Sequence, residues 1–183
     1  MHSELAAGLI GEAERWLAPH RAALGRDLPA YLNHVRRVLC FYVLLCERQK
    51  LRPDPAAAAA AAYHDIGIWT DRTFDYLEPS SAGLARALAA AGKPELLDAG
   101  AAMVLWHHKL TPADPHLPYA TELFRRADWI DVSLGLLRFG LRFSTVGSVR
   151  RRYPNLGFHW RLVQLTCRQF LRRPWNPLPM LRR

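Results

Sequence analysis

The stretch PAAAAAAAYHDIG at residues 55–67 predicts a helix that is buried on most sides. Alanine is the strongest helix former, Asp54 can cap the first turn, and Pro55 suits the first helical position. Because the seven alanines provide almost no polar face, other helices should pack around this one. The polar pair His64-Asp65 would then lie at the buried C-terminal end of the helix.

Helical patterns extend from this stretch in both directions. Alanine and leucine are abundant, β-branched residues are sparse, and apolar residues recur at helical spacing. We therefore expect an all-α fold, a helical bundle, with loops at 68–78 and 111–118. The other expected helices cover residues 3–17, 27–49, 79–92, 94–108 and 120–137, with a last helix over 155–171.

The size and composition of the chain favour a single compact core. Its 183 residues are half apolar, which is enough for one sizeable core. No apolar run approaches the roughly 20 residues that a transmembrane helix needs, and acidic residues interrupt the N-terminus where a signal peptide would be apolar. Cys40, Cys46 and Cys167 form no CxxC pair. We therefore expect reduced thiols and a cytoplasmic protein.

Charge divides the chain into two parts. The net charge is +9, yet the acidic residues stop at Asp131, and residues 132–183 carry 11 arginines and no acid. We expect a helical domain at 1–137 and an arginine-rich, partly helical extension at 138–183 that packs on it. The arginines are compatible with a solvated basic face, with a nucleic acid or nucleotide phosphate, or with anionic lipid. In the last case the protein would be peripheral to the membrane.

Candidate metal ligands lie on three of the expected helices. They are His34, His64, Asp65 and Asp128. A single His-Asp dipeptide arises easily by chance, so the whole set and its order carry the interpretation. Imidazole nitrogen combined with carboxylate oxygen suits a divalent ion such as Mn²⁺, Fe²⁺, Co²⁺, Ni²⁺, Zn²⁺ or Mg²⁺.

Four segments between residues 27 and 135 resemble the HD-domain superfamily, which consists of helical metal-dependent phosphohydrolases. They are YLNHVRRV at 31–38, AAYHDIGI at 61–68, MVLWHHK at 103–109 and RRADWIDV at 125–132. The resemblance implies that His34, His64, Asp65 and Asp128 hold one divalent metal ion, and a second ion is possible. It lets Arg37 bind a phosphate or pair with a carboxylate. Asp131 lies three residues after Asp128 on the same helix face, where it would be an acceptor beside the ligands or an ion-pair partner of an arginine, with ligation of the metal as the alternative.

The function that the resemblance implies is hydrolysis of a phosphate ester, in a nucleotide or another small phosphorylated metabolite. Asp65 would orient the attacking water, and Glu78, or Asp75 near it, would act as general acid or base. His107 and His108 would contact the substrate phosphate or donate a proton. Because neighbours on a helix point about 100° apart, we expect one of these two histidines to face solvent.

Two other functions remain open at this stage. The superfamily includes di-iron oxygenases, which need more histidine ligands than the sequence places, since no histidine lies between Asp65 and His107. A non-catalytic module with this fold, binding an anionic partner, is the second alternative.

Overall fold

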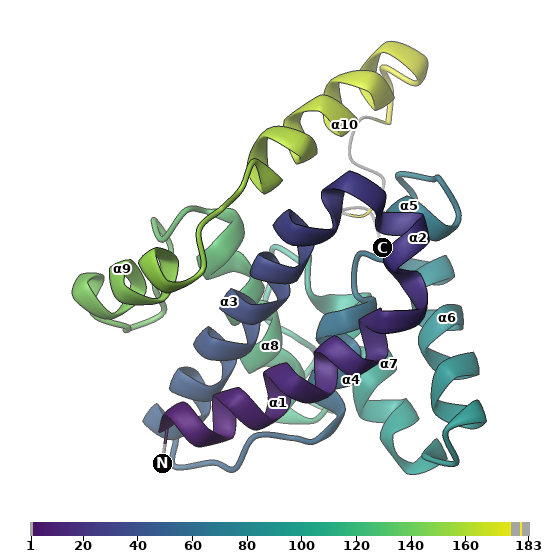
Figure 1. The fold of residues 1–183 in the computed structure, drawn as a ribbon. Coiled ribbons are helices and arrows are strands. Elements are labelled where there is room, and N and C mark those ends of the chain that lie inside the picture. Colours follow the sequence, from purple (N-terminus) through teal and green to yellow (C-terminus); the bar gives the residue numbers. More distant parts are fainter. Residues whose placement is uncertain (1, 177–179, 181–183) are drawn as a thin grey trace.

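The computed structural model describes residues 2–176 and Met180, with side chains from Glu4 onward, and every regular element in this part of the chain is a helix (Figure 1). The expected all-α bundle is therefore confirmed. The longer helices are α1 (His2–Leu17), α3 (Leu28–Arg48), α4 (Ala56–Tyr63), α6 (Leu77–Ala90), α7 (Leu97–Trp106), α8 (Tyr119–Val132), α9 (Phe143–Arg152) and α10 (Phe158–Arg172). The shorter ones are η1 (Ala18–His20), α2 (Arg21–Leu24), η2 (Gly25–Asp27), α5 (Gly67–Thr70) and η3 (Pro94–Leu96).

Helix α4 lies at the centre of the bundle, as the alanine run predicts. It packs against α1, α3, α6 and α7, and all seven of its alanines are buried. Alanine side chains are small, so these four helices can approach α4 closely. The backbone N–H of Ala56 donates to Asp54 Oδ1 at 2.8 Å, which satisfies one free donor of the first turn.

Helix α3 is the longest element and connects α1 and α8 through its packing. It packs against α8 on one side and α1 on another (Figure 1). Its apolar residues, such as Val35, Val38 and Tyr42, are buried between these neighbours. This packing places His34 opposite Asp128, although 94 positions of sequence separate them.

Two segments differ from the sequence-based expectation. The expected loop at 68–78 contains the short helix α5, and α6 begins at Leu77. Helix α8 ends at Val132 instead of continuing to residue 137. The reason is local, since Leu134 and Gly135 have φ angles of 58° and 86°, which no right-handed helix tolerates.

The arginine-rich extension folds back onto the bundle. Helix α9, which was not expected from the sequence, packs against α3, and α10 contacts α3 at its start and then extends away from the bundle (Figure 1). Leu141, Val146 and Phe158 are buried in the same hydrophobic core as the rest of the chain. Arg182 and Arg183 lie outside the described residues.

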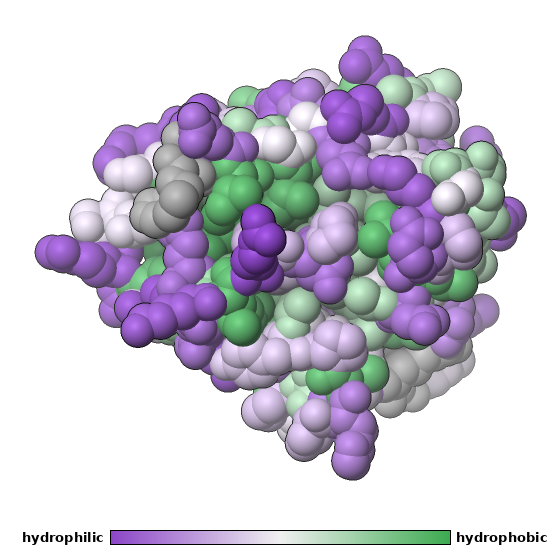
Figure 2. Space-filling view, turned by 90° about the horizontal axis from the view of Figure 1, so that it is seen from below, coloured by the Kyte–Doolittle hydropathy of each residue, from purple (hydrophilic) through white to green (hydrophobic). Residues whose placement is uncertain are grey.

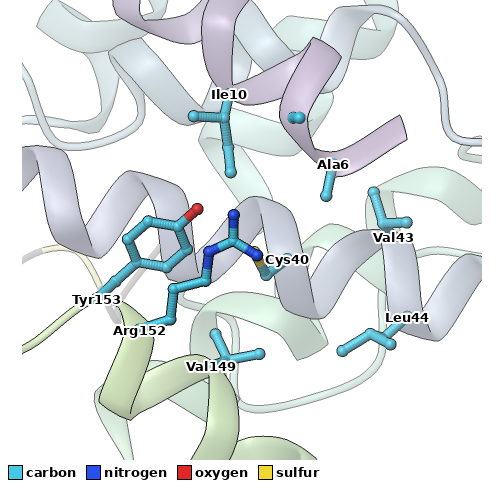
Figure 3. A pocket seen from close by; sticks show the side chains of 9 residues that line it. Ala6, Ile10, Cys40, Val43, Leu44, Val149, Arg152 and Tyr153 are labelled. Atoms are coloured by element: carbon cyan, nitrogen blue, oxygen red, sulfur yellow. The ribbon is translucent and has the colours of Figure 1, made fainter. Parts of the chain in front are cut away.

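A small apolar pocket marks the contact of α9 with α1 and α3. Its volume is about 140 Å³, and Arg152 and Tyr153 reach across it toward Ile10 and Cys40 (Figure 3). Hydrophilic side chains cover much of the lower face of the molecule, with apolar residues gathered in a hollow among them (Figure 2). Among the described helices, none has the length and hydropathy to cross a bilayer.

Candidate metal centre

The four predicted metal ligands meet in one buried cluster. His34 comes from α3, Asp128 from α8, and His64 and Asp65 from the turn that follows α4. The Nε2 atoms of His34 and His64 lie 2.8 Å apart. His64 Nε2 is 3.2 Å from Asp65 Oδ2, and His34 Nε2 is 3.4 Å from Asp128 Oδ1. Two helices and the turn after α4 therefore bring two imidazoles and two carboxylates together.

The Nδ1 atoms of the histidines are already engaged. His64 Nδ1 donates to the carbonyl of Ala61 at 2.8 Å, and a carbonyl can only accept. His34 Nδ1 is 2.7 Å from Asp131 Oδ2, a carboxylate that also pairs with Arg37. The Nδ1 hydrogens thus point away from the cluster, and both Nε2 atoms point into it. This arrangement is typical of metal-binding histidines, whose second nitrogen is fixed by a carboxylate or a carbonyl.

A second group of donors shares Asp65. His107 Nε2 lies 3.3 Å from Asp65 Oδ1, and a ring nitrogen of His108 lies 3.7 Å from the same oxygen. His107 Nδ1 donates to the carbonyl of Val104 at 2.7 Å, which repeats the pattern of His64. Asp65, His107 and His108 form a second set with the proximity that a metal ion requires, beside His34, His64 and Asp65.

Both adjacent histidines face the cluster, contrary to the expectation that one would face solvent. The reason is that α7 ends at Trp106, so His107 and His108 lie in a turn and not on a continuing helix. His107 is fully buried, and the side chain of His108 is 13% exposed. The hydroxyl of Tyr76 forms a hydrogen bond with His108 Nε2.

Several buried polar atoms of the cluster have no hydrogen-bond partner in the described part of the chain. They are Asp65 Oδ1, both carboxylate oxygens of Asp128, and His107 Nε2. Leaving such atoms buried and unpaired costs about 1–3 kcal/mol each. All of them are acceptors that converge on the same space, so a cation would satisfy them together. The residues present therefore fit a divalent metal ion.

The electrostatics of the cluster favour positive charge. Burial alone would lower the pKa of His64, but Asp65 and Asp128 raise it to about 9. Burial would raise the pKa of Asp65, but His64, His107 and His108 hold it well below its usual range. Burial, reinforced by His108, lowers the pKa of His107 to about 4, so this imidazole is neutral near pH 7. The anionic carboxylate of Asp65 and the neutral imidazole of His107 thus remain available as ligands.

Arg37 is linked to the cluster through Asp131, which in turn contacts His34. It is buried, and it donates through Nε to Asp131 Oδ1 at 2.6 Å and through Nη2 to Oδ2 at 2.8 Å. Its Nη1 donates to the carbonyl of Tyr153 at 3.0 Å. Of the two roles expected for Arg37, the structure shows pairing with a carboxylate, and its guanidinium is not placed to bind a substrate. Asp131 is accordingly an acceptor that orients His34.

The acidic residues expected as general acid or base are not among the described donor groups of the cluster. Glu78 is exposed in the first turn of α6, whereas the cluster is buried. Asp75 is half-buried in the preceding loop and belongs to none of the donor groups of the cluster. The role of Glu78 as general acid or base stays a prediction.

Sequence reasoning missed residues that enclose the cluster. The ring of Phe158, from α10, stacks on His34 at a centroid distance of 4.1 Å. His159 Nε2 is 2.9 Å from the carbonyl of Asp131, and the ring of Tyr31 packs on His64. No local motif predicts the contacts of Phe158 and His159, since they depend on how the extension folds back.

Comparisons with protein-family models, with curated proteins and with solved structures found no match for this chain. The helical bundle and its buried His/Asp cluster are compatible with an HD-type fold.

Proposed function

We propose that this protein is an HD-type metal-dependent phosphohydrolase. The observation that supports the proposal is the meeting of His34, His64, Asp65 and Asp128 in one buried cluster, with unpaired acceptor atoms that converge. These residues occur in the order and in the motifs that resemble the HD-domain superfamily. The substrate class proposed is a phosphate ester, in a nucleotide or another small phosphorylated metabolite.

In this proposal His34, His64, Asp65 and Asp128 hold one divalent ion, and Asp65, His107 and His108 can hold a second. An ion bound in such a site lowers the pKa of a coordinated water toward 7 and polarises a phosphoryl oxygen. This second site differs from the expectation that His107 and His108 contact substrate or donate a proton. The proposal of a second site rests on the distances of 3.3 Å and 3.7 Å from the ring nitrogens of these histidines to Asp65 Oδ1.

The residues of the chain would have distinct tasks in hydrolysis. Asp65 offers a carboxylate oxygen that can orient an attacking water. His108 is the least buried of the cluster histidines and is linked to the Tyr76 hydroxyl, so in a protein that holds one ion it is best placed to pass a proton to a leaving group. Asp131 and Arg37 hold the His34 imidazole in position, and Phe158 covers its face and excludes water.

The second donor set also bears on the alternative of a di-iron oxygenase. That function was disfavoured because too few histidine ligands could be placed, and the cluster now contains four histidines. The identity of the bound metal separates the two. Two irons per chain and consumption of O₂ would favour the oxygenase, whereas hydrolysis of phosphate esters favours the proposal. A metal-free protein without turnover would fit the non-catalytic module.

The deciding experiment is elemental analysis of the purified protein and of Asp65→Ala, together with hydrolysis of a chromogenic phosphate ester. Asp98→Ala is the matched control, since Asp98 is an exposed aspartate in the first turn of α7. We expect wild type and Asp98→Ala to hold metal and to hydrolyse the ester, and Asp65→Ala to lose both properties. A wild-type protein that stays metal-free after reconstitution with Mn²⁺, Co²⁺ and Ni²⁺ would overturn the proposal.

A further inference from the structure

A polar cavity lies between the 68–75 segment and α10, outside the metal centre. Its volume is about 480 Å³, within the range of small-molecule sites. None of its lining residues belongs to the His/Asp cluster. Five arginines line it: Arg72, Arg161, Arg168, Arg172 and Arg173.

The arginines face the cavity because of their spacing on α10. Positions 161, 165, 168 and 172 follow one another at helical intervals of three and four, so they share one face of the helix. Leu165 lies on this face between the charged residues and lines the same cavity. Arg72 approaches from the opposite wall, in the loop that follows α5.

The lining of the cavity carries an excess of positive charge. Arg161 pairs with Asp27 Oδ2 at 2.9 Å. Asp75 is the one acidic residue among the lining side chains, against five arginines. Like charges gathered around a low-dielectric wall repel one another and attract an anion of matching charge.

We propose that this cavity binds a small polyanion with two or more phosphate groups, an oligophosphate or a nucleoside polyphosphate. Guanidinium is the side-chain group that binds phosphate oxygens in pairs, and several guanidiniums around one cavity match several phosphates. Trp69 and Phe74 provide an aromatic wall on which a base can stack. Because the arginines line two walls of one cavity, they fit a compact ligand better than the face of a nucleic acid or a lipid surface.

The cavity is near the metal centre but separate from it. The Trp69 ring packs on Tyr31 at 4.8 Å between centroids, and Tyr31 in turn packs on His64 at 6.0 Å. A layer of aromatic side chains thus divides the two sites. The inference goes beyond the proposed hydrolysis and does not rest on it, because oligophosphate would bind whether or not the cluster turns over a substrate.

The test is calorimetric titration of the protein with inorganic tripolyphosphate at about 150 mM salt, where diffuse surface attraction is screened. Arg168→Ala/Arg172→Ala removes two cavity arginines. Arg142→Ala/Arg151→Ala removes the same charge from exposed positions of the extension outside the cavity. Asp65→Ala reports whether the ligand binds at the metal centre instead, and circular dichroism confirms that each variant is folded.

We expect wild type to bind and the cavity variant to bind about tenfold more weakly or worse, since two charge-assisted hydrogen-bonding groups are lost. Arg142→Ala/Arg151→Ala and Asp65→Ala should stay close to wild type. Equal weakening in the two double arginine variants would show diffuse charge attraction and overturn the inference. Absence of binding by wild type, or loss of binding in Asp65→Ala alone, would overturn it as well. Loss of metal or of hydrolysis in Asp65→Ala concerns the proposed function only.

Discussion

His34 and His64 point their Nε2 atoms at each other across 2.8 Å, while the Nδ1 of each is held by a separate acceptor, Asp131 for one and the carbonyl of Ala61 for the other. Two imidazole lone pairs cannot face each other at this distance unless positive charge lies between them. The carboxylates of Asp65 and Asp128 beside them raise the pKa of His64 to about 9, so the pocket binds a proton strongly. A divalent cation would displace that proton and engage the same four side chains.

Asp131 is the residue whose change tests this positioning most directly. In Asp131→Asn the side chain keeps its shape but loses the charge that holds His34 and Arg37. Residues that orient a metal-bound histidine typically change metal affinity by about 10–100-fold, and we expect a loss in this range. Competition between the protein and a metal-sensitive chelating dye measures the affinity.

Glu122→Gln is the matched control for Asp131→Asn. Glu122 lies on the same helix α8 and forms a buried ion pair with Arg125 at 2.7 Å, away from the cluster. Both variants should be destabilised, because each leaves a buried guanidinium without its carboxylate. Glu122→Gln should keep the wild-type metal affinity. Equal loss of affinity in the two variants would mean that Asp131 acts through stability alone.

The second donor set leads to a prediction of stoichiometry. If Asp65, His107 and His108 hold an ion of their own, the metal-saturated wild-type protein contains two ions per chain, and His107→Ala/His108→Ala contains one. We expect this result because His107 Nε2 and Asp65 Oδ1 are unpaired acceptors only 3.3 Å apart. Elemental analysis after removal of excess metal gives the count. The alternative outcome is one ion per chain in both proteins, with hydrolysis lost in the double variant. That outcome would mean that these histidines donate a proton or contact the phosphate.

The parts of the fold that could be predicted from sequence are those with a strong local pattern. The alanine run specified α4, and the periodic apolar residues of α3 gave its extent within one residue at each end. Helix α9 was missed because its sequence, FSTVGSVRRR, buries a single side chain, Val146, and so lacks an apolar stripe. Its position depends on packing against α3 and not on its own composition.

The candidate site likewise contains residues that could be predicted from the sequence and residues that could not. His34, His64, Asp65 and Asp128 could be identified because each lies in a recognisable motif. That both His107 and His108 face the cluster could not be predicted, since it depends on where α7 ends. The sequence does reveal the excess of arginine in the extension, but not that several of these arginines line one cavity. Contact of the extension with nucleic acid or lipid stays a prediction.

Gly67 is the position where a single added carbon should disturb the fold near the site. A Cβ there would lie 2.9 Å from the carbonyl oxygen of Tyr76 and 3.1 Å from Ser80 Oγ, which accepts a hydrogen bond from the Gly67 N–H. We expect Gly67→Ala to lower the free energy of unfolding by about 1–3 kcal/mol, the usual cost of overpacking. Gly11→Ala is the control with opposite sign, since its Cβ meets nothing within 4 Å and alanine favours helix α1. Chemical denaturation measures both, and equal stability of the two variants would contradict the close contact.

The ion pairs of Glu122 predict how stability depends on pH. Burial would raise the pKa of this carboxyl, but hydrogen bonds from Arg125, the Ala113 N–H and Arg126 lower it from its ordinary 4.5 to about 2. A pKa that is lower in the folded state stabilises the protein above the unfolded value, and that stabilisation is lost as the pH falls from about 4.5 to about 2.

Glu122→Gln should therefore reduce the free energy of unfolding near pH 7, by about 1–3 kcal/mol for lost hydrogen bonds to charged groups. The difference from wild type should shrink through the same acidic window, because wild-type Glu122 itself becomes protonated there. Thermal unfolding of both proteins across this range measures the difference. Glu95→Gln, at an exposed position, serves as the control and should match wild type throughout. A difference between Glu122→Gln and wild type that stays constant down to pH 2 would mean that the glutamate acts through shape and not through charge.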